Sequence, residues 1–191
     1  MFSNTRRLIN QFVECNSVVK MQDPLEVAVE RLKQLTKESL LAYWIKGEFE
    51  ESELYAELAK RAKNLGLPDS LVETFWALSK ESKEHGEKLE TIYRKTYGKE
   101  PEPPDIPPIE VYPILHKFER AEDAIEALQM AMESEKLAME VYTRLAKETS
   151  DPELRELFES LAKVERSHYE RLEGELKLLK ELFKEKEKKR G

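Results

Sequence analysis

A glutamate and a histidine stand three positions apart in VERSHYERL, residues 164–172, where apolar residues recur at helical spacing. Residues three apart lie on one face of an α-helix, so Glu165 and His168 project to the same side. Leu161 and Leu172 share that face, which is therefore expected to be buried. Burial of an unpaired carboxylate or imidazole is costly. A bound metal ion would offset that cost, so the spacing indicates metal-ligand chemistry.

Three other helical stretches carry one ionisable side chain in the middle of an apolar stripe. They are Glu48, His85 and Glu135, in the stripes over residues 41–62, 75–92 and 128–145 respectively. Glu48 precedes the predicted turn over residues 64–70 by about 17 residues and His85 follows this turn by about 16, so both lie about 25 Å from it. The same count from the predicted turn over residues 149–152 puts the groups on the other two helices at about 20 to 24 Å.

All five groups are therefore expected at one level of the bundle. Three carboxylates and two imidazoles in a low-dielectric core would repel and desolvate one another unless cations neutralise them. Oxygen and imidazole ligands without thiolate suit iron or manganese and also accept zinc. Tyr55 and Tyr142 follow Glu48 and Glu135 by seven residues and are expected to hydrogen-bond to carboxylates across the core. The other glutamates nearby are interpreted as solvated helix faces: Glu50, Glu51, Glu53, Glu133 and Glu140.

The elements that position these groups are all predicted to be helices. Helical sequence begins at Pro24 and continues, with a bend near Thr36, to about Asn64. The remaining helices are expected to span about residues 70–97, 121–149 and 152–186. Residues 1–22 differ in composition and are predicted to form an appended N-terminal helical arm, with residues 23–191 forming one domain.

A proline-rich segment over residues 98–113 separates the second and third long helices and is predicted to be extended. At about 3.1 Å per residue it can return along a helix about 42 Å long. Two helical hairpins joined by one long crossover form the ferritin-like arrangement of a four-helix bundle. An internal repeat, residues 47–62 against 134–149, supports two hairpins; a helical solenoid is the other reading of such a repeat.

The composition excludes several classes of function. The net charge of −7 opposes binding to nucleic acid. The sequence has no apolar run long enough to span a membrane, so a cytoplasmic protein is expected. Cys15 is the only cysteine, which excludes an intramolecular disulfide and an FeS4 site. The abundance of Glu and Lys is typical of thermophilic proteins.

The two helices with Glu-x6-Tyr, and the two with a histidine at an ExxH-type position, resemble the rubrerythrin branch of the ferritin-like diiron-carboxylate family over residues 48–172. The resemblance implies a centre of two iron ions that reacts with hydrogen peroxide or oxygen, as a peroxidase or ferroxidase. It implies these ligands: Glu48 and Glu135 as terminal carboxylates, Glu165 as a bridge, and His85 and His168 as nitrogen donors.

The sequence departs from the family pattern in two places. Ser82 stands where the family has a second bridging glutamate, and its short hydroxyl is expected beside the metals. Glu81 is an alternative ligand if a π-bulge turns it inward. The four-cysteine module of rubrerythrins proper is absent from the sequence, so the electrons are expected from a separate donor.

A second reading of the departure at Ser82 is a degenerate bundle with one metal or none, serving as a structural or partner-binding scaffold. The long crossover and the N-terminal arm favour a homo-oligomer, with a dimer as the expected form.

Overall fold

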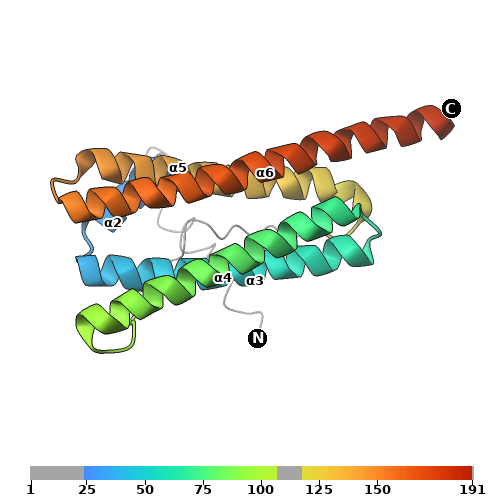
Figure 1. The fold of residues 1–191 in the computed structure, drawn as a ribbon. Helices are drawn as coiled ribbons and strands as arrows, with labels where there is room; N and C mark the ends of the chain where they lie inside the picture. Colours follow the sequence, from blue (N-terminus) through green and yellow to red (C-terminus); the bar gives the residue numbers. More distant parts are fainter. Residues whose placement is uncertain (1–23, 107–117, 191) are drawn as a thin grey trace, which may run out of the picture.

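The structure, a computed structural model, describes residues 24–106 and 118–190, and every regular element in those ranges is helical. The most extensive contacts between helices occur in two hairpins. One consists of α3 (Lys37–Asn64) and α4 (Asp69–Tyr97), and the other of α5 (Ala124–Glu148) and α6 (Pro152–Arg190). Figure 1 shows the two hairpins lying along each other, with α6 continuing beyond the bundle. The predicted all-α bundle of two hairpins is confirmed.

The first helical stretch is broken rather than bent. It consists of α2 (Pro24–Lys33) and α3, and the Thr36 side chain caps α3 by accepting a hydrogen bond from the Ser39 amide. Helix α2 packs on α5. Ion pairs of Lys33 with Glu148 at 2.8 Å and of Arg144 with Glu26 at 3.1 Å join these two helices at the surface.

The turn between α3 and α4 fixes the relative height of the two helices. Gly66 has a φ of 66°, in the left-handed region that glycine tolerates best. The Leu67 amide donates to the carbonyl of Ala62 at 3.0 Å, which closes a Schellman motif, and Leu67 is buried in the core. Asp69 is the first helical residue of α4, and Pro68 occupies the N-cap position without a side-chain hydrogen bond.

The turn between α5 and α6 is capped by a side chain. Asp151 Oδ1 accepts hydrogen bonds from the amides of Glu153 at 3.0 Å and Leu154 at 3.3 Å, and Pro152 is the first residue of α6. A short 3-10 turn, η2 (Ala121–Asp123), leads into α5.

The crossover begins and ends at opposite ends of α3. It leaves α4 at Gly98, and Lys99 pairs at 2.7 Å with Glu38 in the first turn of α3. At its other end, the carbonyl of Phe118 accepts a hydrogen bond of 3.2 Å from Arg61 in the last turn of α3. The two described ends of the crossover are therefore separated by about the length of α3, which is about 42 Å for 28 residues.

The interior of the bundle consists of two apolar clusters with a polar layer between them. On α3, for example, Ile45 belongs to one cluster and Leu54 to the other, with buried Glu48 and Glu51 in between. The same alternation occurs on all four long helices. The buried polar residues of this layer are Glu48, Glu51, Ser52, Ser79, Ser82, Ser134, Glu135, Glu165 and His168.

Some sequence-based expectations concern residues outside the described ranges. The N-terminal arm over residues 1–22 and the part of the crossover from residue 107 onward are among them. Within the described ranges, none of the helices is long and apolar enough to cross a membrane.

Candidate metal centre

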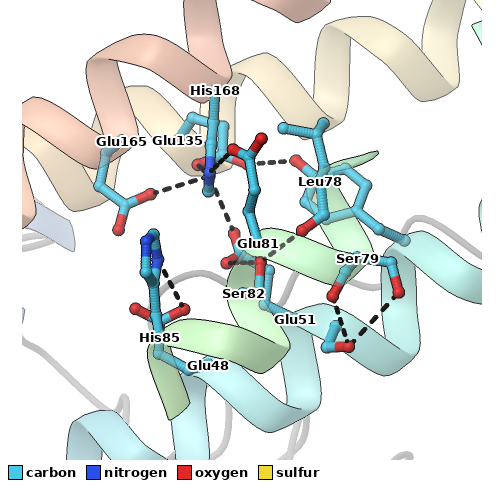
Figure 2. A network of polar contacts seen from close by, with 12 residues as sticks. Glu48, Glu51, Leu78, Ser79, Glu81, Ser82, His85, Glu135, Glu165 and His168 are labelled. Carbon is cyan, nitrogen blue, oxygen red and sulfur yellow. Dashed lines mark hydrogen bonds and ion pairs between the residues drawn. The ribbon is translucent and has the colours of Figure 1, made fainter. Parts of the chain in front are cut away.

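Four buried side chains from three helices converge in the polar layer. Glu51 on α3, Glu135 on α5, and Glu165 and His168 on α6 each offer one ligand atom, and these atoms lie within 4.8 Å of one another. His168 Nδ1 is 3.6 Å from Glu135 Oε2, 3.8 Å from Glu165 Oε2 and 3.9 Å from Glu51 Oε1. Figure 2 shows the three carboxylates directed at this imidazole. We call these four residues the carboxylate–histidine cluster.

Three polar atoms of Glu135 and His168 lack a hydrogen-bond partner among the described residues. Glu135 Oε2 and both ring nitrogens of His168 make no hydrogen bond within the described part of the chain, although Glu135 and His168 are each 1% exposed. Buried polar atoms are normally paired, and three carboxylates around one imidazole leave an excess of negative charge. Oxygen donors with one nitrogen donor fit a divalent transition-metal ion, so the residues present suit the metal expected from the sequence.

Glu51 corrects the sequence-based interpretation. It was expected on a solvated face, but it is 2% exposed and lies in the cluster. It follows Glu48 by three positions, and at 100° per residue two such positions are about 60° apart, so one buried face holds both. The spacing Glu-x2-Glu, together with the missing carboxylate at Ser82, was the signal that could have found it.

Ser82 is buried at the expected place and contacts Glu51. Its hydroxyl lies 2.8 Å from Glu51 Oε2 and 3.0 Å from the carbonyl of Leu78, so it donates across from α4 to α3. The carboxylate missing from position 82 of α4 is thereby replaced in space by one from α3. Serine supplies the hydrogen bond that helps to hold it.

Glu48 and His85 form a separate pair next to the cluster. His85 Nδ1 lies 3.6 Å from Glu48 Oε2, and the imidazole side chain is 28% exposed. Glu48 lies one helical turn before Glu51 on α3, and His85 lies one turn after Ser82 on α4. The contact with Glu48 raises the pKa of His85, against the opposing effect of burial.

The hypothesis that a π-bulge turns Glu81 inward is wrong, because α4 is α-helical throughout Asp69–Tyr97. Glu81 nevertheless does not point to solvent. Both of its oxygens accept hydrogen bonds from Arg171 on α6, at 2.9 and 2.8 Å. Its Oε2 is also 3.7 Å from His168 Nε2, the ring nitrogen that is turned away from the cluster (Figure 2).

The two tyrosines are both buried. The Tyr55 hydroxyl donates a short hydrogen bond across the core to Glu135 Oε1, the type of contact predicted for it. Burial, and then the charge of Glu135, raises the pKa of Tyr55 well above its usual value, so the phenol keeps its proton. Burial alone would raise the pKa of Glu135, but His168, Glu165 and Tyr55 outweigh burial and lower it. Tyr142 packs edge-on against Trp44 at a centroid distance of 5.9 Å.

Two helical hairpins, a long crossover and a central carboxylate–histidine cluster define a ferritin-like four-helix bundle. The rubrerythrin family profile matches residues 39–176, which is most of the chain. The protein therefore belongs to the rubrerythrin family. The sequence-based assignment is confirmed.

Solved structures similar to this chain include two proteins. A hypothetical protein from Pyrococcus furiosus has 30% sequence identity and a TM-score of 0.65, and the match covers 81% of this chain and 96% of that one. An uncharacterized conserved protein from Magnetospirillum magnetotacticum has 24% identity and a TM-score of 0.60, with 75% and 95% coverage, and supports the fold alone. A comparison with curated proteins finds no significant match.

Proposed function

We propose that this protein binds iron in its polar layer and reacts with hydrogen peroxide or oxygen, as a peroxidase or a ferroxidase. The observation that carries the proposal is the carboxylate–histidine cluster, whose four ligand atoms lie within 4.8 Å of one another in a buried position. Membership of the rubrerythrin family supports iron over manganese or zinc, which the same ligand types also accept.

The proposal includes two iron ions. Glu51, Glu135, Glu165 and His168 would hold one, and Glu48 and His85 would contribute to the second. Glu165 lies one turn before His168 on α6, toward the apolar cluster that contains Leu161 and Ile45. Glu48 lies toward the same apolar cluster, because on α3 it is nearer to Ile45 than Glu51 is. Glu165 is thus the carboxylate best placed to serve both ions. Glu51 would supply the carboxylate that position 82 of α4 lacks.

Reduction of one hydrogen peroxide to two water molecules takes two electrons and two protons, and a pair of ferrous ions supplies the two electrons on oxidation to the ferric state. The protein's own part is to hold the ions and to exclude bulk water. Tyr55 holds Glu135 from across the core by its hydrogen bond. His85, the most exposed of the proposed ligands, marks the side on which a small oxidant enters.

A separate electron donor is part of the proposal. The sequence contains one cysteine and so does not offer a four-cysteine iron site of its own. Repeated turnover with peroxide therefore needs a reductant that returns the iron to the ferrous state.

Anaerobic titration with ferrous iron tests this proposal. We expect about two ions per chain, as in di-iron carboxylate bundles, and oxidation of both by one equivalent of peroxide. Oxidation by oxygen at a higher rate would assign ferroxidase chemistry. The variants Glu135→Ala and His168→Ala are expected to lose the tight site. Glu175→Gln is the matched control, because Glu175 bonds to Ser70 and Thr74 on α4 and lies outside the cluster.

Absence of bound iron, or binding that survives in both cluster variants, would reject the proposal. A folded protein with no metal, or with one redox-inactive ion, would instead support a degenerate bundle that serves as a scaffold.

A further inference from the structure

His168 has a carboxylate on each side of its ring. Nδ1 faces the cluster, with Glu135 Oε2 at 3.6 Å, whereas Nε2 faces Glu81 Oε2 at 3.7 Å. The imidazole is 1% exposed, so bulk water does not reach its two nitrogens. The carboxylate of Glu81 is outside the four-residue cluster.

Arg171 fixes the carboxylate of Glu81. Two hydrogen bonds of 2.9 and 2.8 Å join the guanidinium to both oxygens, which is the bidentate geometry that arginine makes with carboxylates. Arg171 follows His168 by three residues on α6, so both lie on one face of that helix. Arg171 is 38% exposed and Glu81 is 36% exposed, so the series Arg171, Glu81, His168 runs from the surface into the core.

We propose that Glu81 and Arg171 are positioning residues that orient His168 for metal binding through Nδ1. A neutral imidazole carries its proton on one nitrogen and offers a lone pair on the other. A carboxylate facing Nε2 favours the proton there and leaves the Nδ1 lone pair directed at the cluster. Carboxylates in this position fix the ring and strengthen metal binding in other metal sites. The separation of 3.7 Å must shorten by about 0.7 Å to become an ordinary hydrogen bond.

The alternative role for Glu81 is direct metal ligation, and it makes an opposite prediction. If Glu81 were a ligand, Arg171 would compete with the metal for its oxygens, and a weaker partner at position 171 would strengthen metal binding. If Glu81 is a positioning residue, the same change weakens metal binding because the carboxylate is no longer held against His168. The substitution Arg171→Lys keeps the charge and removes the bidentate geometry.

Nitrogen-15 NMR of the full-length protein loaded with zinc shows which ring nitrogen of His168 binds the metal and which carries the proton. The inference rests on the proposed metal centre, but zinc makes the test independent of iron chemistry. The three histidines are assigned with His85→Asn and His116→Asn variants. We expect His168 to bind zinc through Nδ1 and to show a downfield, slowly exchanging proton on Nε2. Glu81→Leu should move that proton signal upfield and raise the zinc Kd by about 10- to 100-fold.

Arg171→Lys is expected to raise the zinc Kd to a smaller extent. Glu175→Leu is the control, since it removes another carboxylate between α6 and α4, one turn beyond Arg171, and should leave the His168 signals unchanged. Zinc on Nε2, an unchanged Nε2 proton in Glu81→Leu, or tighter zinc binding in Arg171→Lys would each overturn the inference. Failure of zinc to bind the native protein at all would overturn this inference, whereas the metal centre itself is overturned only by failure of the iron titration.

Discussion

The Ser82 hydroxyl on α4 donates a hydrogen bond of 2.8 Å to the Glu51 carboxylate on α3. Both side chains are buried, Ser82 completely. A serine on one helix thus supports a carboxylate supplied by its neighbour. We therefore expect that a carboxylate at position 82 of α4 can replace the one at position 51 of α3.

Exchange of the two residues is the first test. Ser82→Glu alone adds a further buried carboxylate and should destabilise the metal-free protein by about 3 to 5 kcal/mol, the range for an uncompensated buried charge. The double variant Ser82→Glu with Glu51→Ser should recover most of that loss and bind as much iron as the native protein. Chemical denaturation and iron titration measure the two effects. Full iron binding by Glu51→Ser alone would show that Glu51 is not needed.

Substitution of a single cluster carboxylate should have effects of opposite sign on stability and on metal binding. Glu165→Gln removes one charge from a group of three carboxylates around His168. We expect the metal-free protein to gain about 1.4 kcal/mol for each pKa unit of carboxylate repulsion that the substitution relieves. Iron binding should weaken in the same variant. Denaturation with a chelator and again with excess iron gives both numbers.

Glu175→Gln provides the comparison for that experiment. It weakens hydrogen bonds to Ser70 and Thr74 without touching the cluster, so a small loss of stability and no change in iron binding are expected. A loss of stability in metal-free Glu165→Gln would mean that the cluster is held together by its own interactions and does not need a cation.

The hydrogen bond from Tyr55 to Glu135 makes a separate prediction. Tyr55→Phe removes the donor and leaves the ring, so the apolar packing is kept. We expect iron affinity to fall by about 10-fold or more, as for other residues that support metal ligands. Tyr93→Phe is the matched control, because Tyr93 donates a hydrogen bond of 3.1 Å to Glu38 near the C-terminal end of α4, away from the carboxylate–histidine cluster. Equal losses of affinity in both variants would argue against a specific role for Tyr55.

The sequence was sufficient for the fold because the turns have local causes. Gly66 and Asp151 end one helix and begin the next at positions that their own chemistry determines. With a fixed rise per residue, those turns set the height of each polar group. Glu135, Glu165 and His168 meet in the structure for this reason.

Contacts between helices determine the details of the site, and the spacing of apolar residues along the sequence does not indicate which contacts form. A buried stripe is wide enough for both Glu48 and Glu51, and only packing against α4 and α6 decides which carboxylate joins the cluster. The role of Glu81 depends on Arg171, 90 residues further along the chain. Long-range pairs of this kind leave no local pattern in a single sequence.

The contact between His85 and Glu48 gives a prediction for pH. Because Glu48 raises the pKa of His85 above its usual value, protonated His85 contributes stability below about pH 6.5. That contribution is lost as the pH rises through the raised pKa. In metal-free protein, Glu48→Gln should lower the pKa of His85, and an NMR titration of the His85 ring measures the change. Glu84→Gln, which removes an exposed carboxylate paired with Lys80, should leave the titration nearly unchanged.

Iron binding should remove this titration, because a proton and a metal ion compete for Nδ1 of His85. In protein loaded with one ion per chain, His85 should still titrate if the carboxylate–histidine cluster fills first. Addition of a second ion should then abolish the titration, and iron affinity at the second site should fall as the pH is lowered. Zinc can replace iron in the NMR experiment. Loss of the His85 titration at the first equivalent would instead mean that Glu48 and His85 belong to the tighter site.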